Sequence, residues 1–129
     1  MSIRKVKLID GVRLDNDPTS TSGSQDLQGV TPKRLTLLIQ IVMTGAPTNL
    51  TLSVDVSANQ GLTLIDYDKL ITEAGVDGPV SSVVYTATAD DIISLSPEDV
   101  IDYVRLDAVV TGTSAVKYFT LDAWLIIEY

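Results

Sequence analysis

The fold class follows from the stretch YFTLDAWLIIE, residues 118–128. Apolar residues take every second position from Phe119 to Ile127, and the positions between them are filled by Thr120, Asp122, Trp124 and Ile126. A period of two residues is typical of a β-strand whose two faces meet different surroundings. The run is also longer than the usual strand of about five or six residues. It therefore predicts a long strand with one buried face.

The same period recurs along the rest of the chain. It predicts further strands at residues 35–43, 49–57, 62–65 and 100–110, and one more within residues 80–88. The strand at 35–43 is apolar on both faces, so we expect it to be central in its sheet or covered by another subunit. Links with glycine or proline at 44–48 and 111–114 are typical of hairpin turns. Residues 67–74 are predicted to be a connection with one or two helical turns, and residues 96–99 a single helical turn.

These elements predict an all-β fold, namely an antiparallel β-sandwich, jelly-roll-like, with about seven or eight strands and an irregular N-terminal segment. A chain of 129 residues has the size of a single domain. Residues 1–34 are predicted to form an N-terminal arm or loop segment with the first strand, and residues 35–129 the sandwich body. Because residues 15–25 contain no apolar residue, we expect a loop or mobile arm there.

Charge is unevenly distributed along the chain. The net charge is −8, yet residues 1–34 hold six basic and four acidic residues, while residues 35–129 hold three basic and thirteen acidic ones. Nucleic-acid backbones and anionic membranes attract positively charged proteins. The overall acidity therefore predicts that neither nucleic acid nor a membrane is a partner. The start of the chain has too short an apolar stretch for a signal peptide, so we expect the protein to stay where it is made.

The residues needed for most enzyme chemistry are missing. The chain has no histidine and no cysteine, which removes the commonest general base, the thiolate nucleophile and the usual zinc and haem ligands. The carboxylate pairs Asp15/Asp17, Asp66/Asp68 and Asp90/Asp91 are of the kind that bind Ca²⁺, but none stands in a calcium-loop pattern. The sequence predicts no enzyme, no cofactor and no metal site, and calcium binding at Asp15/Asp17 stays open.

Aromatic residues point to an interface. If Phe119 and its alternate neighbours face the core, then Tyr118, Trp124 and Ile126 lie on the outer surface of the sheet. The second apolar face of the strand at 35–43 would add Leu38 and Val42. We predict that these five residues form a contact between subunits. The opposite phase, with Trp124 in the core, stays open.

The order of features resembles a family. A basic opening is followed by Leu14-Asp15-Asn16, by Ser22-Gly23-Ser24 leading to Asp26-Leu27, by Leu35-Thr36-Leu37 and by Thr51-Leu52-Ser53-Val54. The chain closes with residues 102–108, Thr111-Gly112-Thr113 and residues 119–125. This order, carried by strands and turns, resembles small virion accessory β-sandwich proteins of tailed bacteriophages, which act in capsid decoration or in head and tail structures.

The resemblance implies a structural protein at the virion capsid surface that is made in the host cytoplasm. It would bind and stabilise the lattice of the major capsid protein, as a homotrimer and without chemistry. The basic residues would then contact an acidic capsid lattice: Arg4, Lys5, Lys7, Arg13, Lys33 and Arg34. The acidic middle of the chain, Ile65 to Leu95, departs from the family, so a head or a tail position stays open.

A carbohydrate-binding or host-adhesion module, in a phage tail or a cell-surface protein, is the alternative. It would use Trp124, Tyr118 and Tyr103 as a stacking face for sugar rings. An enzyme acting through a pair of aspartates is a third and more remote reading.

Overall fold

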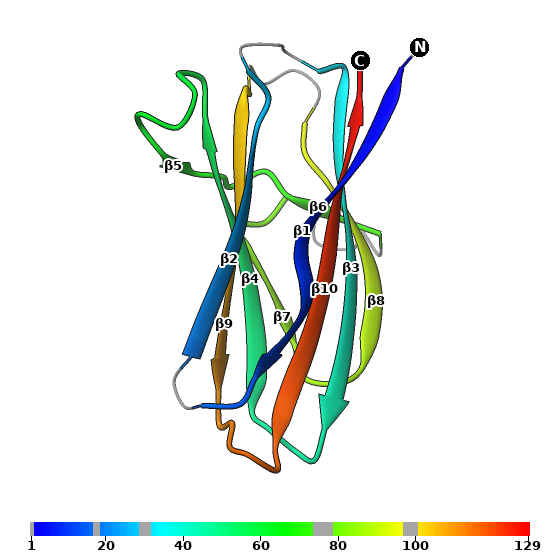
Figure 1. Ribbon diagram of the computed structural model, residues 1–129, viewed down its shortest axis with the longest axis vertical. Helices are drawn as coiled ribbons and strands as arrows, with labels where there is room; N and C mark the ends of the chain where they lie inside the picture. The colour runs from blue at the N-terminus through cyan, green and yellow to red at the C-terminus, as the bar shows by residue number, and fades with distance from the viewer. Residues whose placement is uncertain (1, 17–18, 29–31, 74–78, 97–100) are drawn as a thin grey trace.

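The computed structural model describes residues 2–16, 19–28, 32–73, 79–96 and 101–129 (Figure 1). Within these residues the chain is all-β, with ten strands in two antiparallel sheets. The strands are β1 (Ile3–Leu14), β2 (Thr19–Asp26), β3 (Arg34–Thr44), β4 (Asn49–Ser57), β5 (Ile65–Asp66), β6 (Ile71–Thr72), β7 (Ser82–Tyr85), β8 (Ala89–Ser94), β9 (Tyr103–Thr111) and β10 (Tyr118–Glu128). The described part of the chain has no helix with the length and apolar character needed to cross a membrane.

The two sheets pack as two layers. Sheet A has the strand order β1-β10-β3-β8-β6, and sheet B has the order β2-β9-β4-β5, with β7 pairing to β4 as well. The ten strands exceed the seven or eight that the sequence predicts, mainly because β2 and β8 were not expected. β3 is the third of the five strands in sheet A, which confirms the central position expected from its two apolar faces.

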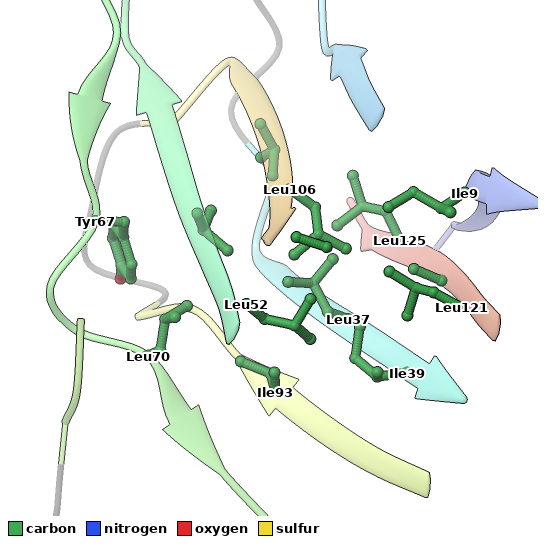
Figure 2. Close-up of a cluster of buried hydrophobic side chains, with 14 of the residues drawn as sticks. Ile9, Leu37, Ile39, Leu52, Tyr67, Leu70, Ile93, Leu106, Leu121 and Leu125 are labelled. Carbon is green, nitrogen blue, oxygen red and sulfur yellow. The ribbon is translucent and has the colours of Figure 1, made fainter. Parts of the chain in front are cut away.

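The core lies between the layers and is built by alternate residues of the long strands. On β10 the buried positions run from Phe119 to Ile127 in steps of two, and each residue between them is partly exposed. Leucine and isoleucine side chains from both sheets meet in this space (Figure 2). The burial pattern confirms the phase that places Trp124 on the outer face of β10.

Both predicted hairpins are wrong. β3 and β4 are joined by residues 45–48 but belong to different sheets, and so do β9 and β10. The short links cross from one layer to the other, a distance of about 10 Å between packed sheets. Gly45 and Gly112 both adopt φ of 70° in these links, a conformation that favours glycine. The turn chemistry was recognised correctly, but it does not reveal which strand becomes the neighbour.

The N-terminal segment is part of both sheets. β1 is one edge strand of sheet A, and β2 is the edge strand of sheet B that pairs with β9 from Thr19↔Val110 to Asp26↔Tyr103. The loop expected at residues 15–25 is therefore corrected to a strand over most of its length. An edge strand with one solvent face obtains its stability from backbone hydrogen bonds to its neighbour, so a serine-rich sequence is sufficient there.

The shorter predicted elements need smaller corrections. The strand expected at 62–65 begins only at Ile65, and Leu62 is 88% exposed. The strand expected within 80–88 is β7, as predicted, whereas the helical connection expected at 67–74 contains β6 instead. The turn predicted at residues 96–99 lies outside the described residues beyond Ser96. Finally, β8 was not expected, because its sequence ADDIIS does not alternate.

Candidate functional site

The outer face of sheet A gathers most of the residues predicted to form interfaces. The registers of β1, β10, β3 and β8 place outward side chains in rows that cross the strands. One row holds Lys7, Trp124, Leu38 and Ile92. The next row toward the chain termini holds Lys5, Ile126, Thr36 and Ser94. The next row in the opposite direction holds Asp122, Gln40 and Asp90. A further row holds Arg13, Thr120 and Val42, and Tyr118 follows at the end of β10. All five residues predicted as a subunit contact share this face.

Cations of β1 lie over the aromatic rings of β10. The Nζ atoms of Lys5 and Lys7 are 5.1 Å and 4.6 Å from the ring centroid of Trp124. The guanidinium of Arg13 is 3.8 Å from the ring centroid of Tyr118. Such contacts contribute about 0.5–1 kcal/mol at exposed sites. They hold the basic side chains against the sheet and cover the aromatic rings.

Lys7 is the most firmly held of these cations. Its Nζ lies 2.9 Å from Asp10 and 3.0 Å from Asp122. Asp122 also accepts a hydrogen bond of 2.7 Å from the backbone N–H of Gly11. Hydrogen bonds to Asp10 and then Asp122 raise the pKa of Lys7. The charge of Lys7 is therefore largely balanced within the chain.

The remaining predicted cations collect at one end of the sandwich. Arg4 pairs with Ile127 in the register, Arg34 pairs with Glu128, and the backbone N–H of Lys33 donates to the carbonyl of Glu128. Figure 1 shows both chain termini at this end. We call Arg4, Lys5, Lys33 and Arg34 the basic end. Among the described residues, only Arg34 of these four has an acidic side chain within 4 Å, and that distance to Glu128 is 3.9 Å.

Several hydrophobic side chains on the outer face of sheet A are exposed. Val42 is 54% exposed, Ile71 43% and Ile92 40%. A hollow of about 460 Å³ lies over the same face, lined by Arg34, Thr36, Ile71, Ile92, Ser94 and Leu95. The sequence did not single out Ile71 or Ile92, because neither strand that carries them alternates for long enough to reveal its faces.

The outer face of sheet B has a different character. Outward positions of β2 and β4 are mostly serine and threonine, and the charged residues form one cluster. Arg105 lies 2.6 Å from Asp55 and 3.2 Å from Asp107. Asp66 is opposite Asp55 in the register. This arrangement is an ionic network of one arginine and three aspartates, and Val84 and Val109, which flank Thr51 in the register, are exposed hydrophobic residues of the same face.

Hydrogen bonds between carboxyl groups govern titration in this cluster. Partial burial, followed by a hydrogen bond with Asp55, raises the pKa of Asp107 to about 6. A hydrogen bond with Asp55 also raises the pKa of Asp66. For Asp55 burial acts upward, but hydrogen bonds from Asp107, Asp66 and Arg105 outweigh it and lower the pKa. As the pH falls, Asp66 and Asp107 therefore take up protons before Asp55 does.

We expect Asp107→Asn to stabilise the protein at neutral pH. The folded-state pKa of about 6 lies above the ordinary value of 3.8, so the contribution of Asp107 to stability is present below pH 3.8 and is lost as the pH rises through 6. Asparagine keeps an oxygen for Arg105 and has no proton to lose. After allowance for solvent screening, the expected gain is about 1 kcal/mol at pH 8. Urea denaturation at pH 3.5 and pH 8 measures it, and a loss of stability at pH 8 would contradict the expectation.

The carboxylate pairs considered for metal binding are dispersed. Asp15 lies 3.1 Å from Arg13, while Asp17 is outside the described residues. Asp91 faces inward and accepts a hydrogen bond of 2.7 Å from the hydroxyl of Tyr85, which links β8 to β7 of the other sheet. Burial and this bond raise the pKa of Tyr85. Over the described ranges, no group of three or more acidic side chains is placed to hold a metal ion.

The three aromatics suggested as a sugar platform do not form one. Trp124 and Tyr118 lie on the outer face of sheet A, whereas Tyr103 belongs to the outer face of sheet B. The rings of Trp124 and Tyr118 are also covered by cations of β1. Stacking of a sugar requires an open ring face. The sugar-stacking face predicted from the sequence is therefore wrong.

Known structures share the fold. The chain is similar to the SPBc2 prophage-derived protein YomS, with a TM-score of 0.57, 10% identity, and coverage of 97% of this chain and 93% of that one. It is also similar to a chain of infectious bursal disease virus Gx strain, with a TM-score of 0.50, 13% identity, and coverage of 98% of this chain and 31% of the viral chain. TmCBM61, solved in complex with β-1,4-galactotriose, has a TM-score of 0.46 and 12% identity, with coverage of 97% and 69%.

At such identities the likeness establishes the fold alone, which is a β-sandwich of jelly-roll-like type. No protein-family model and no curated protein sequence matches the chain significantly.

Proposed function

We propose that the chain is a non-catalytic structural subunit of a tailed-phage virion. In this role it binds the lattice of the major capsid protein at the capsid surface, as an oligomer, and stabilises that lattice. The observation that carries the proposal is the basic end, where Arg4, Lys5, Lys33 and Arg34 gather on an otherwise acidic sandwich. The fold shared with a prophage-derived protein supports the viral setting.

The charge distribution supports a defined orientation. An acidic body is repelled by an acidic capsid surface, so only the basic end is attracted to it. Each exposed ion pair contributes about 0–1 kcal/mol, which is too little for one copy to remain bound. A repetitive lattice and an oligomeric ligand multiply such contacts, and avidity then supplies the affinity. Weak single contacts are therefore compatible with stable decoration.

Substitutions test the contact better than deletion of the first strand. β1 is hydrogen-bonded to β10 along its length, and Ile9 is buried at 3% exposure. Removing these residues would uncover β10 and damage the fold itself. Exposed side chains of the basic end can be reversed in charge with little effect on packing.

We expect the variant Arg4→Glu/Lys33→Glu to bind capsid shells at least tenfold more weakly than the wild type. The probe is a shell assembled, without this chain, from the major capsid protein of the same phage, and co-sedimentation measures occupancy. Binding of the wild type should also fall as salt rises, because surface charges are screened.

Lys117→Glu provides the control for this measurement. Lys117 is an exposed lysine in the turn before β10, and its side chain is not part of the basic end. The control should bind the shells as the wild type does. Shell binding that is unchanged in Arg4→Glu/Lys33→Glu, or absent in the wild type, would contradict the proposal. Glycan-dependent quenching of Trp124 fluorescence would instead favour a carbohydrate-binding module.

A further inference from the structure

β2 is a long edge strand without the usual protections of an edge. It has eight residues, it is uncharged up to its last residue, Asp26, and it contains no proline. Its register with β9 runs without a shift from Thr19 to Asp26. An edge strand exposes unpaired backbone groups that a further strand can bond, so proteins usually shorten, charge, bulge or cover their edges.

The other edges of the two sheets carry these protections. β1 contains lysines and arginines and has two register shifts. β5 and β6 have two residues each, and β7 has four. Where β8 extends beyond β6, the side chain of Asp91 accepts a hydrogen bond of 2.8 Å from the backbone N–H of Ile92. Across the described ranges, β2 is therefore the edge strand most open to pairing.

The hydrogen bonds of β2 show which of its backbone groups are free. Leu27 continues the register of β2, and its N–H donates to the carbonyl of Asp102 at 2.7 Å. Bonded and non-bonded pairs alternate in an antiparallel ladder, so the N–H and C=O groups of Ser20, Ser22 and Ser24 point away from β9. These serines are exposed, and within the described residues no strand pairs with this side of β2.

β1 contacts β2 from the inner side of the sandwich. Gly23 pairs with the buried Leu106, so a side chain at Gly23 would point inward, where it meets the carbonyl of Leu8. No pairing between β1 and β2 occurs in the described part of the chain. The lateral edge of β2 is therefore left open.

We infer that the free edge of β2 pairs with the same edge of a second copy of the chain. The two strands run antiparallel about a two-fold axis at Ser22, so sheet B continues from one copy into the other. The inference deepens the oligomeric state in the proposed function and rests on that part of it. It does not depend on which lattice the oligomer binds.

This register uses every free group of the edge. Ser22 lies opposite Ser22 of the partner subunit, and Ser20 lies opposite Ser24 of the partner subunit. Each of these pairs exchanges two backbone hydrogen bonds. The side chains that meet are small and uncharged, so no like charges oppose each other across the new pair of strands.

Other registers satisfy fewer groups. A shift of two residues in one direction places a serine opposite Pro18, which has no N–H to donate. A shift in the other direction places a serine opposite Asp26, whose carbonyl already accepts a hydrogen bond of 2.9 Å from the side chain of Gln25. The axis at Ser22 is therefore the favoured one.

The chemistry of the edge favours a second copy over a segment of a different protein. When a strand is added to a sheet, backbone bonds give affinity, and pockets for alternate side chains select the sequence. An edge of serines offers no such pocket. A second copy needs none, because the two-fold axis matches each free group to its counterpart.

The contact is small, and the pair is accordingly weak. One pair of strands covers less surface than the ~1,600 Å² of a standard interface, so we expect a dissociation constant of about 10–100 μM. Each copy also carries a net charge of −8, and this repulsion opposes pairing. Added salt screens the repulsion and should strengthen the pair, whereas it should weaken binding to capsid shells.

The pair is compatible with the lattice contact. Its axis is perpendicular to the sheets, so the outer faces of sheet A in both copies point to one side. Lys5 and Arg34 lie on that face, and both copies therefore present them to the same surface. Bivalency raises the affinity for a repetitive lattice without any new contact. A pair of this kind uses one surface, whereas the homotrimer implied by the family resemblance uses two different ones.

Two variants of Ser22 test the free edge. We expect sedimentation equilibrium of the wild type, well above the dissociation constant and in high salt, to approach twice the 13.9 kDa chain mass. Ser22→Pro should sediment as a single chain, because proline removes the edge N–H and its ring blocks the approach. It leaves the bonds to β9 in place, as proline does on edge strands. Ser22→Thr keeps the N–H and should pair as the wild type does, and circular dichroism verifies that both variants fold.

Single cysteines test the register. The chain has no cysteine of its own, so any disulfide joins two copies through the introduced residue. In Ser22→Cys the two Cα atoms lie about 5.5 Å apart, which a disulfide can bridge. In Ser24→Cys they are displaced by roughly 14 Å along the strands. Under mild oxidation, Ser22→Cys should therefore cross-link roughly ten times faster than Ser24→Cys, or more.

Three results would overturn the inference. They are a wild-type mass of one or three chains, a Ser22→Pro variant that is folded and still paired, and equal cross-linking of the two cysteine variants. The cysteine comparison does not depend on whether the proline variant folds. All measurements use the pure protein without shells, so a failure here can be separated from a failure of shell binding.

Discussion

Gly23→Val is expected to destabilise the protein by about 3 kcal/mol or more, because it forces the edge strands of the two sheets apart. Gly23 lies in the middle of β2, opposite Leu106 of β9. A Cβ atom at this position would lie 2.1 Å from the carbonyl oxygen of Leu8 and 2.7 Å from its carbonyl carbon. Both atoms belong to the backbone of β1, so rotation of a side chain cannot relieve the clash. One of the two strands must move.

The position of the clash explains the size of the expected loss. Leu8 lies where the register of β1 shifts between Lys7 and Ile9, so β1 bends toward β2 at this point. Pushing β1 outward strains its pairing with β10 and opens the core beside Ile9, which is 3% exposed. Total stabilities of domains are about 5–15 kcal/mol, so the loss is a large fraction of the whole.

Urea denaturation with Ser22→Val as the control measures this effect. Ser22 precedes Gly23 on β2 and is exposed on the outer face, so valine there meets solvent. The control should change stability by about 0.5 kcal/mol or less. Gly23→Ala should fall between the two. If the alanine variant were more stable than the wild type, as glycine replacement is wherever a side chain fits, the close approach of β1 and β2 would be refuted.

The same close approach shows what the sequence could and could not predict about the fold. Alternation identified the long strands and the outward position of Trp124, because a strand that is buried on one side alternates apolar and polar residues. No comparable sequence pattern shows which strands pair with each other. The links after Thr44 and Thr111 contain typical turn residues, yet each crosses between sheets. Gly23, read as part of a loop, is the site where two edge strands touch.

The candidate site was predictable in composition but not in arrangement. Arg4, Lys33 and Trp124 were identified from charge and alternation, and the structure places them on one sheet and its end. Their division into a basic end and an outer face depends on registers between distant strands. Ile92 escaped notice because β8 is short and does not alternate.

Leu121→Ala is expected to destabilise the protein by about 3–4 kcal/mol, within the range measured for leucine truncation in well-packed cores. Leu121 is fully buried at the centre of β10, between Val12 of β1 and Ile41 of β3 in the register, and it faces the side chains of sheet B (Figure 2). Truncation removes buried methyl groups and leaves a cavity that a core bounded by two paired sheets cannot easily close.

Leu62→Ala is the matched control, since it makes the same chemical change at a side chain that is 88% exposed. Thermal and urea denaturation should show a change of about 0.5 kcal/mol or less for this control. Equal effects of the two substitutions would contradict the assignment of the inner face of β10. Because that assignment also sets which residues of β10 face outward, the same result would remove Trp124 and Ile126 from the outer face of sheet A.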